Sequence, residues 1–222
     1  MLYPSDGIIF KPLTGSPSKR PAVLLLQRHP SMPIAKKHRT VYFGCLDTRR
    51  NLPPATSRKR GESNFLTRFE RVYLEQELKT LAKKRRFATG REFALEGFGR
   101  ADLLFMAWIH VTTAEDFTAL ALKGGLRLTA IEAKIKDWRK GLMQATRYRF
   151  FANRSLLVLP PAAARIATEY LVTFRDLNVG LWEFDPATNR IRKHFTPRNR
   201  RPLNSKAWER AVHAVTRGLK LR

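Results

Sequence analysis

A long amphipathic pattern begins just after Ser63, where apolar residues recur at intervals of three and four. Residues at these intervals share one face of an α-helix, so the pattern predicts a helix over 64–86, with Ser63 or Asn64 as its N-cap. A helix of this kind needs another element on which to bury its apolar face. The apolar residues of the pattern are Phe65, Leu66, Phe69, Val72, Tyr73, Leu78 and Leu81.

Shorter apolar segments follow, separated by turn residues such as Gly97-Phe98-Gly99 and Gly124-Gly125. The expected strands are 91–95, 100–109, 126–135, 155–159, 179–184 and 190–195. The expected later helices are 139–153, 162–174 and 205–218. Because helices and strands alternate along the chain, we expect an α/β fold with a mixed β-sheet flanked by helices.

The first 62 residues differ from the rest in composition, since they hold eight of the 13 prolines. We interpret 1–62 as a basic, Pro-rich N-terminal extension that is ordered in part only on a partner, with short strands at 22–26 and 40–44. Residues 53–61 read as a linker. The expected core is 63–200, and 201–222 is expected to form a basic C-terminal helix.

Positive charge dominates the chain, with 43 Lys and Arg against 18 Asp and Glu and a net charge of +25. The excess is concentrated in the flanks: residues 1–60 hold 12 basic and 2 acidic residues, and residues 190–222 hold 11 and 1. This balance excludes an acidic metabolic enzyme and predicts a polyanionic partner.

The cysteine content and the hydropathy pattern exclude further classes of protein. The single cysteine, Cys45, excludes an internal disulfide framework and a cysteine-based zinc site, as is typical of proteins in a reducing cytosol. No apolar run approaches the roughly 20 residues that a membrane helix needs. We therefore expect a soluble, cytoplasmic and nucleoid-associated protein with no membrane partner.

Three ionisable residues are expected to converge on neighbouring strands. Asp102 follows the turn into the second expected strand, and Glu132 and Lys134 share one face of the third, because strand side chains alternate. Two carboxylates can hold a hard divalent cation, and a lysine beside them can orient or deprotonate a water. The motif Glu-x-Lys alone is a weak signal, since it recurs at Glu77-Leu78-Lys79 inside the first helix. The strand copy is stronger, because it ends an apolar strand where unpaired charges would be costly.

The chain from Ser63 to Phe195 resembles the PD-(D/E)XK nuclease superfamily. The resemblance rests on the first helix, the strand carrying Asp102, the segment Glu132-Ala133-Lys134, and the helix and strand that follow. Ala101 stands where the family usually has Pro. The resemblance implies a restriction-endonuclease-like fold with an αβββαβ core.

It also implies roles for the three residues. Asp102, Glu132 and the backbone carbonyl of Ala133 would coordinate Mg²⁺ or Mn²⁺. Lys134 would position the water that attacks the scissile phosphorus, and the metal would stabilise charge on the transition state.

Members of this superfamily often add a glutamate from the first helix, and Glu70, Glu75 and Glu77 compete for that role here. On a helical wheel Glu70 and Glu77 fall within the broad apolar face, whereas Glu75 points to the polar side. We favour Glu70, with Glu77 as the alternative, because the segment 69–74 resembles the first-helix signature of the family's transposon-end-cutting members.

Helix 139–153 places Gln144 and Tyr148 on one face, one turn apart. The pair resembles the Q-x-x-x-Y motif of the RecB-like branch of the superfamily. This implies that Gln144 touches the active-site water or the phosphate, and that Tyr148 supports it or stacks on a nucleotide. Basic residues nearby are expected to contact phosphates without reading sequence: Lys136, Arg139, Lys140, Arg147, Arg149, Arg198, Arg200 and Arg201.

The resulting hypothesis is a metal-dependent nuclease that hydrolyses DNA and leaves 5′-phosphate and 3′-hydroxyl ends, in a mobile-element, recombination or defence context. Two alternatives stay open. One is a non-enzymatic nucleic-acid-binding protein that keeps the fold as a scaffold. The other is the cutting subunit of a transposase-like or defence assembly. The expected partner is DNA, with RNA as the alternative, and the chain would work as a homodimer or inside a larger complex.

Overall fold

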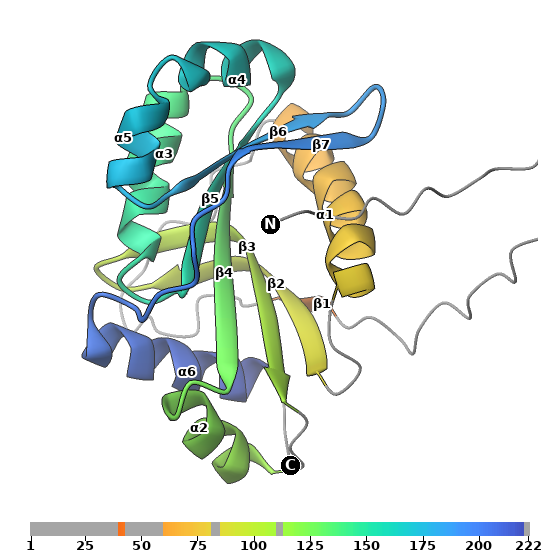
Figure 1. Ribbon diagram of the computed structural model, residues 1–222. Coiled ribbons are helices and arrows are strands. Elements are labelled where there is room, and N and C mark those ends of the chain that lie inside the picture. Colours follow the sequence, from red (N-terminus) through yellow and green to blue (C-terminus); the bar gives the residue numbers. More distant parts are fainter. Residues whose placement is uncertain (1–39, 43–59, 81–84, 110–112, 220–222) are drawn as a thin grey trace, which may run out of the picture. The chain divides into compact units, whose positions relative to one another are not determined.

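The computed structural model describes residues 40–42, 60–80, 85–109 and 113–219, and their centre is a mixed β-sheet of seven strands (Figure 1). The strands lie side by side in chain order, from β1 to β7. Neighbours β2/β3, β3/β4 and β6/β7 are antiparallel, whereas β1/β2, β4/β5 and β5/β6 are parallel. The strands are β1 Thr40–Tyr42, β2 Arg85–Leu95, β3 Gly99–Ile109, β4 Leu126–Ala133, β5 Arg154–Leu159, β6 Gly180–Asp185 and β7 Arg190–Phe195.

Helices cover both faces of this sheet. They are α1 Arg60–Thr80, α2 Ala114–Leu122, α3 Trp138–Tyr148, α4 Pro161–Thr168, α5 Leu171–Asp176 and α6 Ser205–Leu219. Helix α1 lies on one face, and α2 to α6 contribute to the core on the other. The predicted fold class, an α/β protein with a mixed sheet flanked by helices, is therefore confirmed.

The α1 face is an aromatic core. Tyr73 of α1 meets Phe105 of β3 edge to face, with ring centroids 5.5 Å apart, and it lies 5.7 Å from Trp182 of β6. Phe69 packs against Tyr73 at 5.5 Å and against Phe184 at 5.7 Å. Such pairs add to the stability that apolar burial supplies. The single amphipathic face of α1 thus holds strands β3 and β6 together.

The opposite face forms a second core that extends to the last helix. Ala211, Val212 and Val215 of α6 are buried there, together with Phe117 of α2. Thr118 of α2 and the facing threonine of α6 are in contact through their hydroxyls at 3.3 Å. The basic helix expected within 201–222 is therefore present, and its apolar side belongs to the same core as α2 and α3.

Several predicted boundaries differ from the structure. Helix α1 begins at Arg60, so the N-cap predicted at Ser63 or Asn64 is wrong, and the predicted helix 139–153 and strand 126–135 end earlier, at Tyr148 and Ala133. Helix α1 ends at Thr80, and Arg85–Leu95 is a strand whose first residue pairs with Ile109, so the predicted helix 64–86 is too long and the strand 91–95 too short. Pairing with all of β3 outweighs the helical spacing at the end of the pattern. The predicted helix 162–174 is two helices, and at the break Tyr170 packs on Trp138 with centroids 4.9 Å apart.

Helix α2 was not expected from the sequence. Thr113 caps it, because its hydroxyl accepts a hydrogen bond from the Asp116 amide at 3.1 Å, and Phe117 and Ala121 are buried one turn apart. In the N-terminal extension, β1 falls within the expected strand 40–44, and the expected strand 22–26 lies outside the described residues. Across the described ranges, no helix has the length and apolar character needed to cross a membrane.

We predict that Phe69→Ala lowers the free energy of unfolding by about 3–5 kcal/mol, because it opens a cavity under α1, the helix that the described residues place on that face. Urea denaturation measures the change. Thr67→Ala, on the exposed side of the same helix, is the control and should change stability by less than about 0.5 kcal/mol. Equal effects of the two substitutions would contradict the packing described for α1.

Candidate active site

Asp102 and Ala133 meet where strands β3 and β4 stop pairing. The last main-chain pair of this ladder is Leu103 with Ile131, and just beyond it Asp102 Oδ2 accepts a hydrogen bond from the Ala133 amide at 2.9 Å. The carboxylate therefore takes the place of a main-chain acceptor. Asp102 is buried, and its contact with the sheet holds its carboxylate in position.

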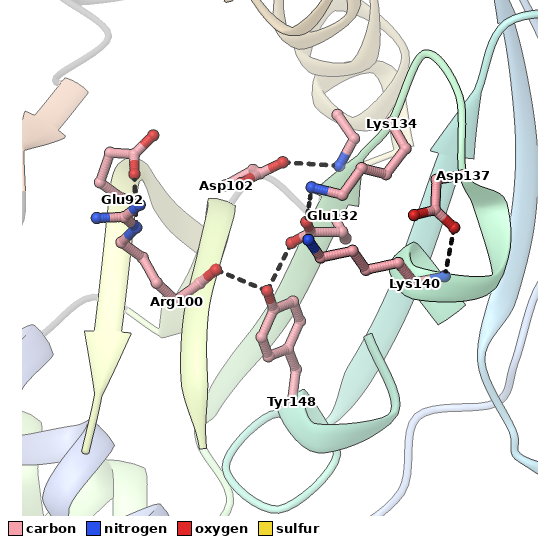
Figure 2. Close-up of polar contacts among 9 residues, drawn as sticks. Glu92, Arg100, Asp102, Glu132, Lys134, Asp137, Lys140 and Tyr148 are labelled. Atoms are coloured by element: carbon pink, nitrogen blue, oxygen red, sulfur yellow. Dashed lines mark hydrogen bonds and ion pairs between the residues drawn. The ribbon is translucent and has the colours of Figure 1, made fainter. Parts of the chain in front are cut away.

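Glu132 is the fully buried member of the site, with 0% of its surface exposed. Its neighbours Leu128 and Ala130 line the core under α3, whereas Ile131 and Ala133 face α1, so alternation turns Glu132 toward α3. There its Oε1 forms an ion pair with Lys134 Nζ at 2.7 Å (Figure 2). Lys134 follows β4 directly, and its amide still donates to the Val158 carbonyl at 3.1 Å. The predicted convergence of Glu132 and Lys134 is present.

Tyr148 ties three elements together (Figure 2). Its buried hydroxyl lies 2.5 Å from Glu132 Oε2 and 2.6 Å from the Arg100 carbonyl oxygen, and its one proton can be donated to either acceptor. The ring approaches Gly99, where a Cβ would lie 3.7 Å from it and where φ is +92°. Tyr148 thus fixes Glu132 to the start of β3 and to the end of α3.

Lys140, Gln144 and Tyr148 are spaced four residues apart on α3, so they form a stripe along one side of the helix. The Oε1 atom of Gln144 is buried and has no hydrogen-bond partner, which leaves an acceptor that a water or a hydroxyl could satisfy. Lys140 is exposed, and its side chain points toward Glu132 and Lys134 (Figure 2). Asp137 begins the helix by accepting a hydrogen bond from the Lys140 amide at 3.1 Å. The stripe therefore offers a cation, an acceptor and a hydroxyl to one region.

Glu70 lies elsewhere. It is buried, as the helical wheel predicts, but its carboxylate is ion-paired with Arg91 of β2. Arg91 pairs with Leu103, which faces α1, so this ion pair lies on the face of the sheet opposite to Glu132. The competing Glu75 is exposed, and the side chain of Glu77 lies outside the described residues. The structure therefore does not bring Glu70 into the cluster of Asp102, Glu132 and Lys134.

Two residues that sequence reasoning did not select complete the surroundings. Glu92 lies where the β2/β3 ladder skips a pair, between Arg91–Leu103 and Phe93–Ala101, has a φ of 55°, and forms an ion pair with Arg100 at 2.9 Å. A left-handed backbone is uncommon for a residue with a side chain, and such positions cluster at functional sites. No local signal marks it, because it arises where the pairing of β2 with β3 is interrupted.

The predicted phosphate contacts differ in their environment. Arg149 is half-buried and donates to the Leu177 carbonyl at 2.6 Å, and burial, followed by the charge of Arg200, lowers its pKa. We therefore assign Arg149 to the fold. Arg200 is held beside it, because its amide donates to the Asn153 carbonyl at 3.0 Å. The other predicted contacts are exposed: Lys136, Arg139, Lys140, Arg147, Arg198 and Arg201.

The described residues contain no cluster of three or more His, Cys, Asp or Glu side chains able to hold a metal ion. Asp102 and Glu132 are the two carboxylates of the candidate site. Asp102 accepts a hydrogen bond from the Ala133 amide, and Glu132 is the residue before Ala133 at the end of β4. Comparisons of the chain with protein-family models, with curated proteins and with solved structures give no match.

We predict that Lys134→Met destabilises the protein by about 3 kcal/mol, because it leaves the buried Glu132 carboxylate without its cation. Adding Glu132→Gln should recover part of the loss, and urea denaturation of the three variants measures this. Lys140→Met is the matched control on an exposed lysine and should change little. An equal loss in the Lys134 and Lys140 variants would contradict the importance of the ion pair.

We predict that Gly141→Ala lowers stability by about 1–3 kcal/mol, because the new Cβ would lie 2.6 Å from Leu157 Cδ1 and 2.9 Å from Lys134 Cγ. Helix α3 would have to move away from β5, or the side chains of Leu157 and Lys134 would have to shift. Gly61→Ala in α1 makes an ordinary 3.4 Å contact with Ile135 and should be neutral or slightly stabilising. Thermal unfolding of both variants tests the close approach, and a stabilised Gly141→Ala would contradict it.

Proposed function

We propose that the protein is a metal-dependent nuclease that hydrolyses DNA phosphodiester bonds at the cluster of Asp102, Glu132 and Lys134. The observation that carries this proposal is the position of Glu132, a buried carboxylate on a central strand held by Lys134 on one oxygen and Tyr148 on the other. Burying a charged group is costly, so a cluster of this kind needs a reason beyond stability.

The order and direction of the elements support the resemblance to the PD-(D/E)XK superfamily. Helix α1 is followed by three antiparallel strands, β2, β3 and β4, then by α3 and by β5, which is parallel to β4. This agrees with the αβββαβ core that the resemblance implies, with α2 inserted before β4. The proposal of a restriction-endonuclease-like fold rests on this agreement and on the motif residues.

The donor set fits a hard divalent cation. Asp102 and Glu132 supply carboxylate oxygens, and the carbonyl of Ala133 supplies a main-chain oxygen, all from the adjoining ends of β3 and β4. Oxygen ligands are those that Mg²⁺ prefers. When bound, Mg²⁺ or Mn²⁺ would act as a Lewis acid, activating a water and stabilising the charge that develops on the phosphate.

The remaining residues have roles that follow from their contacts. Tyr148 holds the Glu132 carboxylate in orientation, and the buried oxygen of Gln144 can accept a hydrogen bond from the attacking water. Lys134, which is ion-paired with Glu132, can orient that water and balance the charge of the phosphate. The water would attack phosphorus as the bond to the 3′ oxygen breaks, which leaves a 5′-phosphate and a 3′-hydroxyl.

A second candidate, a non-enzymatic DNA-binding protein on the same fold, is favoured by one observation. Both oxygens of Glu132 already have protein partners, so its charge is compensated without a cation. In that case the exposed basic residues around α3 would bind phosphates and the cluster would only stabilise the fold. A cutting subunit that is silent without its partner chains would share the cluster but need the assembly.

We predict Mg²⁺- or Mn²⁺-dependent cutting of supercoiled and linear DNA, abolished by EDTA and reduced at least about a hundredfold by Asp102→Asn. The new amide keeps an acceptor for the Ala133 amide, so the variant should fold and still shift DNA on a gel. Glu115→Gln, an exposed carboxylate of α2, is the control and should cut normally.

Outcomes separate the candidates. DNA binding without cutting by the unmutated protein would favour the non-enzymatic candidate or the partner-dependent subunit. Cutting that survives Asp102→Asn would overturn the assignment of the site.

A further inference from the structure

The exposed side of α3 combines apolar and cationic side chains beside the stripe that faces the candidate site. Arg139, Met143 and Arg147 follow one another at helical spacing, and Phe150 continues the line in the turn after the helix. We propose that this surface binds an unpaired strand of nucleic acid, whose bases stack on Phe150 and whose phosphates contact the flanking arginines. The inference rests on the proposed function and narrows it to substrates with a single-stranded segment.

Exposure of the apolar members is the first observation. Met143 is 64% exposed and Phe150 is 36% exposed, although both are surrounded by cations in a chain of net charge +25. Leu203 is also exposed, and its amide donates to the Arg149 carbonyl at 2.9 Å, which places it beside the same turn. A duplex presents its phosphates to a surface and keeps its bases stacked inside. Apolar side chains between the cations instead suit the faces of unstacked bases.

The ring of Phe150 is held in place by a second aromatic residue. Phe98, in the turn between β2 and β3, lies against it with ring centroids 5.3 Å apart and planes inclined by 33°. A ring that is already fixed loses little conformational freedom when a base stacks on it. Phe150 lies two residues from Tyr148, whose hydroxyl is bonded to Glu132, and Phe98 lies two residues from Arg100, whose carbonyl contacts the same hydroxyl. A base on Phe150 would therefore lie next to the candidate site.

Arg139 at the other end of the helix is also held in a defined position. Its guanidinium lies 4.6 Å from the Trp138 ring centroid and 5.3 Å from that of Tyr170, and it donates to the Tyr170 hydroxyl at 3.2 Å. An arginine stacked in this way keeps other donors of its fork for a phosphate. The surface therefore carries a fixed cation, Arg139, at one end and a fixed aromatic ring, Phe150, at the other. The charge of its arginines is opposite to that of a polynucleotide backbone.

The test is a fluorescence anisotropy titration in EDTA, with labelled single-stranded DNA, the matching duplex, a duplex with an overhang, and the matching single-stranded RNA. Phe150→Ala should weaken binding of the single strand and of the overhang by about 5- to 100-fold, and binding of the blunt duplex by less than about twofold. The two single strands distinguish DNA from RNA as the source of the bases. Phe150→Tyr, which keeps the ring, should restore single-strand binding.

Two further variants guard against a folding artefact. Met143→Ala removes a largely exposed side chain, so it should not disturb folding, and it should also weaken binding of the single strand alone. Leu122→Ala, an equally exposed apolar residue at the end of α2, is the matched control and should change neither affinity. Equal losses for single strand and duplex in Phe150→Ala, or no loss in either, would overturn the proposal, and no loss would favour a protein partner for this surface.

The inference and the proposed function fail separately. If Asp102→Asn abolishes cutting while Phe150→Ala binds every DNA normally, the nuclease stands and the stacking surface does not. If no metal supports cutting while Phe150→Ala selectively loses the single strand, the surface stands and the nuclease does not.

Discussion

A carboxylate without solvent contact, such as that of Glu132, persists in a folded protein only where neighbouring groups compensate its charge. Here Lys134 supplies an opposite charge and Tyr148 a hydrogen bond, one to each oxygen. The fold holds both partners in position. Lys134 is anchored by its own amide to β5, and Tyr148 reaches the carboxylate because α3 packs closely on β4 and β5.

The position of Glu132 follows from the sheet. Strand β4 has neighbours on both sides, β3 and β5, so its side chains can leave the sheet only toward α1 or toward α3. The α1 side is filled by aromatic and aliphatic residues, with Tyr73 and Phe105 in contact. The polar partners of Glu132 therefore lie on the α3 side, and Gly141 leaves room there for the lysine stem. Helix α1 thus covers the apolar face of the sheet, and α3 supplies Tyr148 as a hydrogen-bond partner of Glu132.

Much of this arrangement could be predicted from sequence because its signals are local. Period-two alternation places Glu132 and Lys134 on one side, and period-four spacing aligns Gln144 with Tyr148. Strands β3 and β7 and helix α6 were expected within a residue of their observed bounds. Helix α2 has local signals too, in the cap at Thr113 and the apolar pair that follows, but the helix spans only nine residues, so its periodic pattern is short.

Other features depend on contacts between distant segments, which no local pattern encodes. The start of β2 at Arg85 follows from pairing with β3, and the left-handed backbone of Glu92 lies where that pairing skips a residue. The wheel predicts that Glu70 is buried, but only the tertiary structure shows that its partner is Arg91, on the face away from Glu132. Likewise, the sequence suggests Arg149 as a surface cation, whereas the fold uses it to hold the Leu177 carbonyl.

The ion pair and hydrogen bonds described for the Glu132 carboxylate and the Tyr148 hydroxyl link residues of one stretch of chain, Arg100 to Tyr148. Helix α1, the β6–β7 hairpin and α6 cover that stretch and carry charge, but they contribute no atom to these contacts. Evolution could therefore exchange or extend the flanking segments, and with them the choice of target and the strength of attachment, without disturbing the central geometry. A chain organised in this way is suited to diversification by recombination at its two ends.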